Sequence, residues 1–435
     1  CLVYTNLKKF INEEDAMDER IFFHIDVNSA FLSWTALSML QEGSGTDLRL
    51  IPSIVGGDMA KRHGVVLAKS LPAKAYGITT GEPVINALRK CPGLVTAAPD
   101  HAMYHRRSQE LMLLLSGICP DIEQVSIDEC YMDYTPIAKK YTAPEEAARQ
   151  IKDLVRDTLG FTVNVGISDR KVLAKMASDF KKPDLVHTLY VREIPDKMWP
   201  LPVSSLFLCG QSSVETLRKL GILTIGDLAH ARRDILEAHL KSHGLTLWQY
   251  ANGIDDSDIT PKPVKMKGVG NSTTLQRDAL TREDAQPVLL SLAESVAGRL
   301  RASGELAGMV STEIKYATFQ SVSHQMQLTV PTASSQAIFE TACRLFDELW
   351  NGQPIRLLGI RTSKLVPETE PVQLSLFDYQ PPAAKAPVWG TSQPAPDREK
   401  QQRLDKALDD LRSKYGKNII MRGSLMDAPS TPCSS

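Results

Sequence analysis

Three carboxylates stand at the ends of strongly apolar runs. Asp26 follows "IFFHI", and Asp128 and Glu129 lie within "QVSIDECYMDY". A buried carboxylate is costly unless it is paired, hydrogen-bonded or bound to a metal. Three unpaired carboxylates brought together would repel one another, and two divalent cations would remove that repulsion. Mg²⁺ prefers carboxylates and substrate phosphates as ligands, so the chemistry indicated is phosphoryl transfer with two Mg²⁺ ions.

A helix cap is the alternative interpretation of Asp26, because Asp, Asn and Ser favour that position and Asn28 and Ser29 follow directly. The order of the predicted elements decides against it. With residues 31–99 set aside as an insertion, the pattern is strand, helix, strand, strand, helix, strand, which is ferredoxin-like. In that pattern the first strand ends at the sheet edge where the hairpin joins the second and third strands. Asp26 therefore meets Asp128 and Glu129.

The remaining elements follow from periodicity and from turn residues. In the first part of the chain we predict strands at 21–26, 50–55, 64–68, 121–127, 130–134 and 162–167, and helices at 28–40, in "GEPVINALRKCPG", at 101–117 and at 144–159. Residues 190–255 lack strand signals, and "CGQSSVETLRKLGILTIGDL" indicates two short helices around a Gly turn. A second mixed unit has predicted strands at 266–275, 308–319 and 324–330 and helices at 285–303 and 335–350.

The composition is that of a multi-domain globular protein. The 435 residues suffice for three or four domains, and 43% are hydrophobic. No run approaches a membrane span and no cleavable signal peptide is evident. The seven cysteines contain no C-x-x-C, which argues against a disulfide framework or a zinc site and favours a reducing cytoplasm. The net charge of −1 announces no polyanion partner, so any nucleic-acid site must be a local patch.

Two basic segments fit the same chemistry. "GISDRKVLAKMASDFKKPD" places Lys171, Lys175 and Lys182 near one another on a helix and its end, and "AKSLPAKAYG" carries Lys69 and Lys74 in the inserted segment. Lysines beyond a carboxylate centre suit the charge of a triphosphate. A solvated surface is the alternative, and for the inserted pair taken alone it is the favoured one.

Five motifs now carry a family resemblance. "HIDVNSAF", "VSIDECYMD", "NVGISDRKVLAKMASDFKKPD", "TLRKLGILTIGDLA" and "GVGNSTTL" resemble, in order and spacing, those of the Y-family, or translesion, DNA polymerases, nearest the bacterial DNA polymerase IV branch. The resemblance implies an α+β multi-domain right-hand fold. Its expected parts are a ferredoxin-like palm (20–30 and 100–189), small fingers (31–99), a helical thumb with a helix-hairpin-helix (190–257), an α+β little finger or polymerase-associated domain (266–366) and a flexible C-terminal tail (367–435) with a short amphipathic helix at 402–415.

The resemblance also assigns site residues. Asp26, Asp128 and Glu129 match the catalytic metal ligands and Val27 matches a position that offers its backbone carbonyl. Phe31 matches the steric gate against a ribose 2′-OH, with Ser29 and Ala30 beside it, and Lys74 and Lys182 match triphosphate contacts. DNA contacts are expected at Gly210, Gly221, Ser272, Thr273 and Thr274. Departures from the family pattern are Asn28, Ala30, Leu71, Lys74 and the turn "FLCG" at 207–210.

The resemblance implies a polymerase of low processivity, without proofreading, that copies past damaged bases in the cytoplasm as a monomer. Its partners would be primer–template DNA, dNTPs and the bacterial sliding clamp, with no membrane. "QLSLF" resembles a clamp-binding motif, with contacts from Gln373, Leu374, Leu376 and Phe377; a chance apolar patch is the alternative. Two other functions remain open: an inactive polymerase-like scaffold, which would typically lack the carboxylates, and a nucleotidyl cyclase, which would lack the helix-hairpin-helix and the clamp-like tail.

Overall fold

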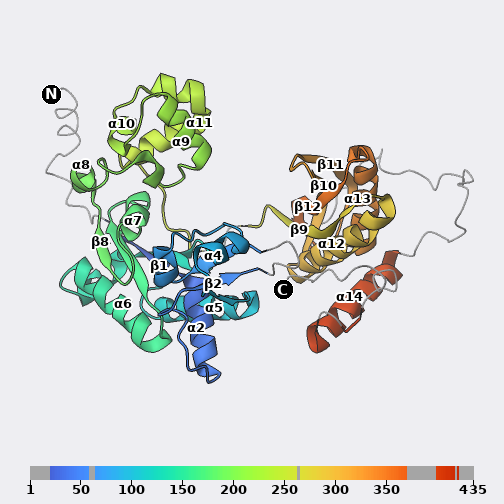
Figure 1. The fold of residues 1–435 in the computed structure, drawn as a ribbon, viewed down its shortest axis with the longest axis horizontal. Helices are drawn as coiled ribbons and strands as arrows, with labels where there is room; N and C mark the ends of the chain where they lie inside the picture. The colour runs from blue at the N-terminus through green and yellow to red at the C-terminus, as the bar shows by residue number, and fades with distance from the viewer. Residues whose placement is uncertain (1–19, 58–63, 262–264, 370–397, 417–418, 421–435) are drawn as a thin grey trace, which may run out of the picture. The chain divides into compact units, whose positions relative to one another are not determined.

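The computed structural model describes residues 20–57, 64–261, 265–369, 398–416 and 419–420 (Figure 1). The chain divides into two compact units, one drawn from residues 1–57 and 65–263 and the other from 58–64 and 264–435. Within the described residues, none of the helices is both long and apolar enough to cross a lipid bilayer.

A five-stranded sheet with the order β5-β6-β1-β7-β8 forms the centre of the first unit. β1 pairs antiparallel with both β6 and β7, and β8 adds a parallel strand beyond β7. The strands are β1 (Phe22–Val27), β5 (Ile122–Gln124), β6 (Glu129–Asp133), β7 (Val163–Ser168) and β8 (Val186–Thr188). The order second, third, first, fourth for the predicted strands confirms the ferredoxin-like pattern, with the first and third strands as neighbours.

The two faces of this sheet have different neighbours. The main helices are α5 (His101–Ser116), α6 (Pro144–Leu159) and α7 (Lys171–Ser178). Phe23 and Ile25 of β1 are buried in the core that α5 and α6 close. Because side chains alternate along a strand, the residues between them point the other way. Phe22 packs on α7, and His24 and Asp26 bond to side chains of α7.

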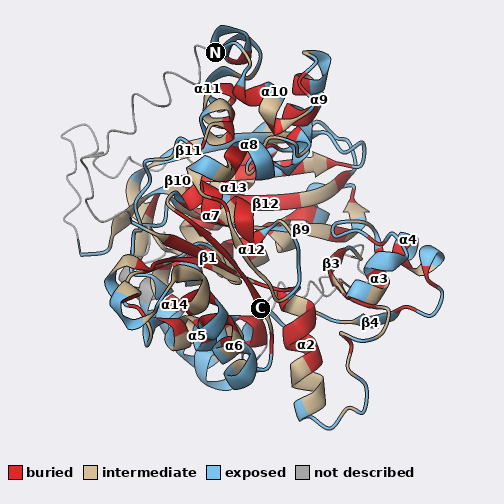
Figure 2. Cartoon of the chain, turned by 90° about the vertical axis from the view of Figure 1, so that its left-hand side faces the viewer, coloured by how far each residue is buried: buried red, intermediate tan, exposed pale blue. Residues whose placement is uncertain are grey.

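An inserted segment joins β1 to α5. It contains α2 (Ala30–Gln41), α3 (Leu71–Ala75), α4 (Val84–Lys90) and a three-stranded sheet of the order β3-β2-β4, made of β2 (Ser53–Gly56), β3 (Val66–Lys69) and β4 (Val95–Ala97). The first half of α2 is buried and its second half is more open (Figure 2). The short parallel strand β4 is a finding of the structure, since three residues carry no periodicity.

A helical segment completes the first unit. It holds α8 (Ile194–Lys197), α9 (Gln211–Lys219), α10 (Ile225–Ala229) and α11 (Arg233–Ala251), the last with a break at Lys241. α9 and α10 are the two short helices predicted around a Gly turn. Gly221 sits in that turn at φ 78°, a left-handed conformation that glycine adopts without steric penalty.

The second unit is a four-stranded antiparallel sheet of the order β11-β10-β12-β9 with two helices packed on it. Its elements are β9 (Gly268–Ala279), α12 (Arg282–Ala302), β10 (Glu305–Tyr316), β11 (Ser321–Thr332), α13 (Ser335–Leu349) and β12 (Ile355–Pro367). The sequence predicts three strands, and the fourth, β12, is an addition. Its "IRLLGIRTSKLVP" does not alternate cleanly, and its pairing with β9 shifts register between Ile355 and Leu357.

The predicted helix near the C-terminus is present but longer, as α14 (Arg398–Tyr415). The spacing of Leu404, Leu408 and Leu411 places them on one face, but Leu404 is 50% exposed and Leu411 38%, while Leu408 is half-buried. Charged residues of this helix make contacts with the unit. Asp405 accepts a hydrogen bond from the Ser335 amide at the start of α13, at 3.2 Å, and Asp409 pairs with Arg301 of α12, at 2.6 Å.

Candidate active site

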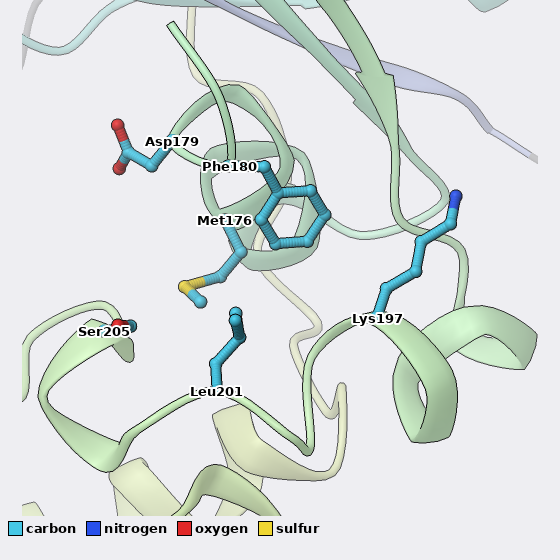
Figure 3. A pocket seen from close by; sticks show the side chains of 6 residues that line it. All are labelled: Met176, Asp179, Phe180, Lys197, Leu201 and Ser205. Carbon is cyan, nitrogen blue, oxygen red and sulfur yellow. The ribbon is translucent and has the colours of Figure 1, made fainter.

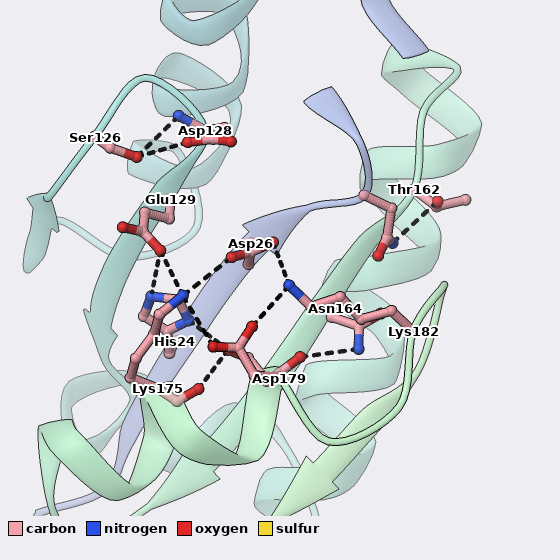
Figure 4. A network of polar contacts seen from close by, with 12 residues as sticks. His24, Asp26, Ser126, Asp128, Glu129, Thr162, Asn164, Lys175, Asp179 and Lys182 are labelled. Carbon is pink, nitrogen blue, oxygen red and sulfur yellow. Dashed lines mark hydrogen bonds and ion pairs between the residues drawn. The ribbon is translucent and has the colours of Figure 1, made fainter. Parts of the chain in front are cut away.

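Strand pairing places Asp26 opposite Glu129. The two are register partners in the β1–β6 ladder, and the Val27 amide donates to the Asp128 carbonyl at 3.0 Å. His24 lies two residues before Asp26 and shares its face of the sheet. Ligand atoms of His24, Asp26 and Glu129 all lie within 4.8 Å of one another (Figure 4).

Asp128 points elsewhere. Its Oδ1 accepts a hydrogen bond from Ser126 Oγ at 2.6 Å, within the loop that leads into β6. Its carboxylate is not part of the group formed by His24, Asp26 and Glu129. The structure thus brings the carboxylates of Asp26 and Glu129 together. Asp128 precedes Glu129 in the chain, but its carboxylate faces Ser126.

Two lysines from the opposite side of the site neutralise the carboxylates. Lys175 of α7 lies 2.7 Å from Glu129 and 3.2 Å from Asp26. Lys182 lies 2.8 Å from Asp26 and 2.9 Å from Asp179. Burial alone would lower the pKa of each ammonium group, but the charge of Asp26 and the hydrogen bonds to carboxylates outweigh it and raise both pKa values. We call His24, Asp26, Glu129, Lys175 and Lys182 the active-site cluster.

His24 is the fifth residue of the cluster. Its Nδ1 lies 2.8 Å from Ser178 Oγ and its Nε2 lies 3.3 Å from Glu129 Oε2. Burial lowers the pKa of His24, against the raising effect of Glu129. The His24 ring 3.3 Å away, together with Lys175, lowers the pKa of Glu129 to about 2 although burial opposes it. Glu129 is therefore a carboxylate at any physiological pH.

The carboxylate pair has the character of a divalent-cation site. Two carboxylate oxygens converge with a histidine nitrogen, and the ammonium groups of Lys175 and Lys182 supply positive charge beside them. A hard cation such as Mg²⁺ takes carboxylate oxygens and leaves its other positions to water and phosphates. The residues present therefore fit a divalent cation.

The ring of Phe31 is fixed by a stack. It lies on the Tyr104 ring of α5, with centroids 4.4 Å apart and planes 8° apart, and meets His101 edge-on. The Tyr104 hydroxyl pairs with Thr35 Oγ1 at 2.8 Å. Ala30, next to Phe31, is small and buried. The Phe31 ring is supported by Tyr104 of α5.

The other predicted contacts lie outside the cluster. Ser29, at φ 48°, occupies the position before α2 without a capping side-chain hydrogen bond, and Lys74 is exposed at the end of α3. Gly210 precedes α9 as its cap residue. The set Ser272, Thr273 and Thr274 lies on β9 of the second unit, paired with Gly359, Leu358 and Leu357 of β12. The proposed clamp contacts Gln373, Leu374, Leu376 and Phe377 lie outside the described residues.

The departure "FLCG" has a visible consequence. Leu208 adopts φ 64° and its side chain is 51% exposed. A left-handed conformation costs a branched residue about 1 kcal/mol that glycine would not lose. The turn before α9 is therefore strained in this chain.

The structure gives three residues contacts that the sequence does not predict. His24 is not among the site residues predicted from the sequence, although its i, i+2 spacing from Asp26 on a strand is a usable signal. Lys175 is grouped with other lysines by the sequence, but its contacts with Asp26 and Glu129 span 149 and 46 residues. The support of Phe31 by Tyr104 spans two helices and leaves no local pattern.

A cavity of about 470 Å³ lies beside the end of α7 (Figure 3). Its lining residues are Met176, Asp179, Phe180, Lys197, Leu201 and Ser205. Asp179 links it to the active-site cluster, because this carboxylate pairs with Lys175 and Lys182. The lining of this cavity does not include Asp26, Asp128 or Glu129.

Known proteins resemble both units of the chain. The impB/mucB/samB family matches residues 25–179, and the C-terminal domain of the same family matches 266–376. A DNA polymerase IV of Clostridium acetobutylicum is 44% identical over 408 residues, which cover 94% of this chain and 98% of that protein. The DNA polymerase IV 1 of Bacillus subtilis is 35% identical over 409 residues, covering 94% of this chain and 93% of that protein.

A solved structure supports the fold. A chimeric Y-family DNA polymerase superposes with a TM-score of 0.71 at 21% identity, covering 80% of this chain and 99% of that one. The architecture is thus that of a right-hand Y-family polymerase. With the family and relatives above, the chain belongs to the Y family of DNA polymerases, in the DNA polymerase IV branch.

Proposed function

We propose that this polymerase adds nucleotides at the active-site cluster, with low processivity and past damaged bases. The observation that carries the proposal is the pairing of Asp26 with Glu129 at the β1–β6 edge, opposed by Lys175 and Lys182. The primer 3′-oxygen attacks the α-phosphorus of a dNTP and gives up its proton to solvent. A new P–O bond forms, the bond from the α-phosphorus to the oxygen shared with the β-phosphate breaks, and pyrophosphate leaves.

Members of the Y family depend on metal ions, and we propose two Mg²⁺ ions here. Asp26, Asp128 and Glu129 would hold them, with the Val27 carbonyl as a further ligand. Bound in this way, such ions lower the barrier for the attacking and the leaving oxygen. Asp128 would have to turn from Ser126 to take part, and a Ser hydroxyl at 2.6 Å is a partner it can exchange.

The chain's own residues place the nucleotide. Lys182 is one-third exposed at the rim of the cluster, so its ammonium can pass from Asp26 to a triphosphate oxygen. We assign Lys74 to the same triphosphate as a point charge. Phe31, held by its stack on Tyr104, would close against a ribose 2′-OH, with Ser29 and Ala30 forming the adjoining backbone.

Grip on primer–template DNA would come mainly from phosphate contacts, which give affinity without sequence choice. We assign these to the turns at Gly210 and Gly221 and to Ser272, Thr273 and Thr274 of β9. Such contacts weaken with salt, which accounts for the low processivity. The palm, fingers, thumb and little finger would keep the boundaries predicted from the sequence.

A bacterial sliding clamp would offset the weak grip. We propose that Gln373, Leu374, Leu376 and Phe377 bind it, because tethering raises the effective concentration of the enzyme at the primer end. The enzyme would act in the cytoplasm as a monomer and would lack proofreading.

Primer extension tests the proposal. The purified full chain, Mg²⁺ and each dNTP alone are supplied with an undamaged and a lesion-bearing template. We expect templated addition on both, stopping after a few nucleotides. Binding of primer–template DNA without any addition would favour the inactive scaffold instead.

A further inference from the structure

The helix that carries Lys175 is held on its outer side by a distant segment, residues 255–260, which we call the strap. The strap follows α11 and precedes the connection to the second unit. We propose that Asp255 of the strap and Lys171 of α7 are positioning residues, which hold α7 and so fix Lys175 against the catalytic carboxylates. This inference rests on the proposed function of the active-site cluster.

Asp255 caps α7 from 83 residues further along the chain. Its Oδ2 accepts a hydrogen bond from the Val172 amide at 2.8 Å, and its Oδ1 accepts one from the Ser257 amide at 3.1 Å. Arg170, at the cap position of α7 itself, makes no side-chain hydrogen bond to the first amides of the helix. The first amides of a helix need an acceptor, and an anionic one also suits the positive end of the helix dipole. The strap supplies it.

Lys171 ties the strap to the sheet. Its ammonium donates to Glu123 Oε2 at 2.7 Å and to the Asp258 carbonyl at 2.9 Å, and lies 4.8 Å from the Tyr131 ring centroid. The Thr260 amide donates to the same Glu123 oxygen at 2.8 Å. The Lys171 side chain is only 9% exposed, so these partners hold a desolvated charge that has no alternative in water.

Further contacts fix the strap along its length. Ile259 packs against Phe22, Tyr131 and Ala174, which belong to β1, β6 and α7. Arg20, at the start of the chain's described part, pairs with both Asp133 and Asp258. The strap therefore touches the same two strands that carry Asp26 and Glu129.

α7 is confined between the strap and the sheet. On its inner side, a Cβ at Gly166 of β7 would stand 2.0 Å from the Ala174 carbonyl oxygen, so the helix lies directly on the strand. Lys171 and Lys175 are one turn apart on the helix. Strap contacts at Lys171 and carboxylate contacts at Lys175 thus set the position of one short rigid element. Release of the first would let the second shift.

The matched variants are Asp255→Ala, Asp255→Asn and Asp256→Ala. Asn keeps an acceptor oxygen for the Val172 amide, and Asp256 is the exposed neighbour that serves as a control. Single-nucleotide addition is measured at saturating primer–template DNA over a range of dNTP, and amide hydrogen exchange of α7 is measured on the same proteins.

For Asp255→Ala we expect the maximal rate to fall about ten-fold or more, since small misplacements of a catalytic element are costly. The dNTP half-saturation should change by less than about two-fold, and the α7 amides should exchange faster. Asp255→Asn should restore most of the rate and the protection, and Asp256→Ala should match the parent.

A purely structural role for Asp255 would lower the melting temperature while leaving the rate of the folded protein unchanged, and that result would overturn the inference. Equal loss in Asp255→Ala and Asp255→Asn would overturn it as well. The double variant Lys171→Met with Glu123→Gln removes the second anchor without leaving a buried charge unpaired, and it should repeat the Asp255→Ala result. If the parent adds no nucleotide, the proposed function fails, while the hydrogen exchange of α7 still tests the strap.

Discussion

Two clusters of carboxylates and cations, one in each unit, use different cations. In the active-site cluster, Asp26 and Glu129 face the ammonium groups of Lys175 and Lys182. On α14, Asp409 faces the guanidinium of Arg301, whose Nε and Nη2 bond its two oxygens at 2.6 and 3.0 Å. Arg is a planar fork that fixes a carboxylate by two bonds, whereas Lys is a point charge on a flexible stem.

The two clusters also differ in their hydrogen-bond partners and in their exposure to solvent. Arg301 also donates to the Ala333 carbonyl and Ser335 Oγ, and Asp405 beside it is 2% exposed. Every group there has a protein partner in a fixed geometry. In the active-site cluster the lysines meet two or three carboxylates each, and Lys182 is partly open to solvent. The first arrangement suits a permanent attachment of α14 through Arg301, which we call the α14 joint. The second suits carboxylates that exchange their cation during a reaction.

The largest expected effect is the loss of nucleotide addition when Asp128 is replaced. Asp128→Asn keeps the shape and an acceptor for the Ser126 hydroxyl, so folding should be unaffected. As a proposed metal ligand it should lower single-nucleotide addition about a thousand-fold, or about 4 kcal/mol of transition-state stabilisation. Primer extension and DNA binding are measured side by side, with binding expected near the parent value.

Asp409→Asn is the matched change in the other cluster. It should leave nucleotide addition on a short primer unchanged, because Asp409 pairs with Arg301 and so attaches α14 to α12 within the second unit. Robust extension by Asp128→Asn, or loss of extension in Asp409→Asn, would reverse the roles assigned to the two clusters.

Sequence reasoning succeeded where the pattern was local and failed where a contact was distant. The strand ending at Asp26 and the hairpin at Glu129 follow from apolar runs, and the ferredoxin-like order then brings them together. Lys175 has no such signal, because the sequence of α7 does not indicate which carboxylates this lysine will contact. Asp255 is a still clearer case, since it caps a helix 83 residues away.

α14 shows a different limit. Leu404 and Leu411 mark a helix by their spacing, and the helix is present. Apolar content does not decide which face packs on the unit, since Asp405, bonded to the Ser335 amide at the start of α13, and Asp409, bonded to Arg301, hold the neighbouring face. β12 lacks a strict alternation for a different reason: its pairing with β9 shifts register between Ile355 and Leu357, which interrupts the period of two.

The next effect in size is the release of α14. Arg301→Ala removes the partner of Asp409 and leaves Asp405 with one fewer donor in a buried place. We expect α14 to lose about 2–3 kcal/mol of protection against local opening. Amide hydrogen exchange of α14 measures this, and Lys406→Ala, at an exposed position of the same helix, is the control. Unchanged protection in Arg301→Ala would show that the fork is not the joint.

A smaller effect tests whether the active-site lysine acts as an exchangeable cation. Lys175→Met keeps the length of the side chain but leaves Asp26 and Glu129 facing each other with one charge fewer to neutralise them. Without Mg²⁺ this variant should be less stable than the parent by about 1–2 kcal/mol. Added Mg²⁺ should raise its melting temperature more than that of the parent, because binding to the folded state stabilises it.

The control for that experiment is Lys181→Met, an exposed lysine next to Lys182. It should respond to Mg²⁺ as the parent does. Melting curves in a chelator and in Mg²⁺ give the comparison. If Mg²⁺ stabilises Lys175→Met no more than Lys181→Met, Lys175 is a fixed structural partner and the active-site cluster resembles the Arg301 joint after all.

The smallest expected effect comes from Arg301→Lys, which exchanges one kind of cation for the other at the α14 joint. The charge is retained, but a single ammonium cannot bond both oxygens of Asp409 and reach the Ala333 carbonyl as well. We expect α14 to lose about 1 kcal/mol of protection, roughly the value of one net hydrogen bond, and hydrogen exchange of α14 should place this variant between the parent and Arg301→Ala. High salt should then weaken the Lys joint more than the Arg joint, since the fork depends on geometry as well as on charge. Equal protection in Arg301→Lys and the parent would mean that charge alone holds α14, and the distinction between the two clusters would have to rest on solvent access and not on the cation.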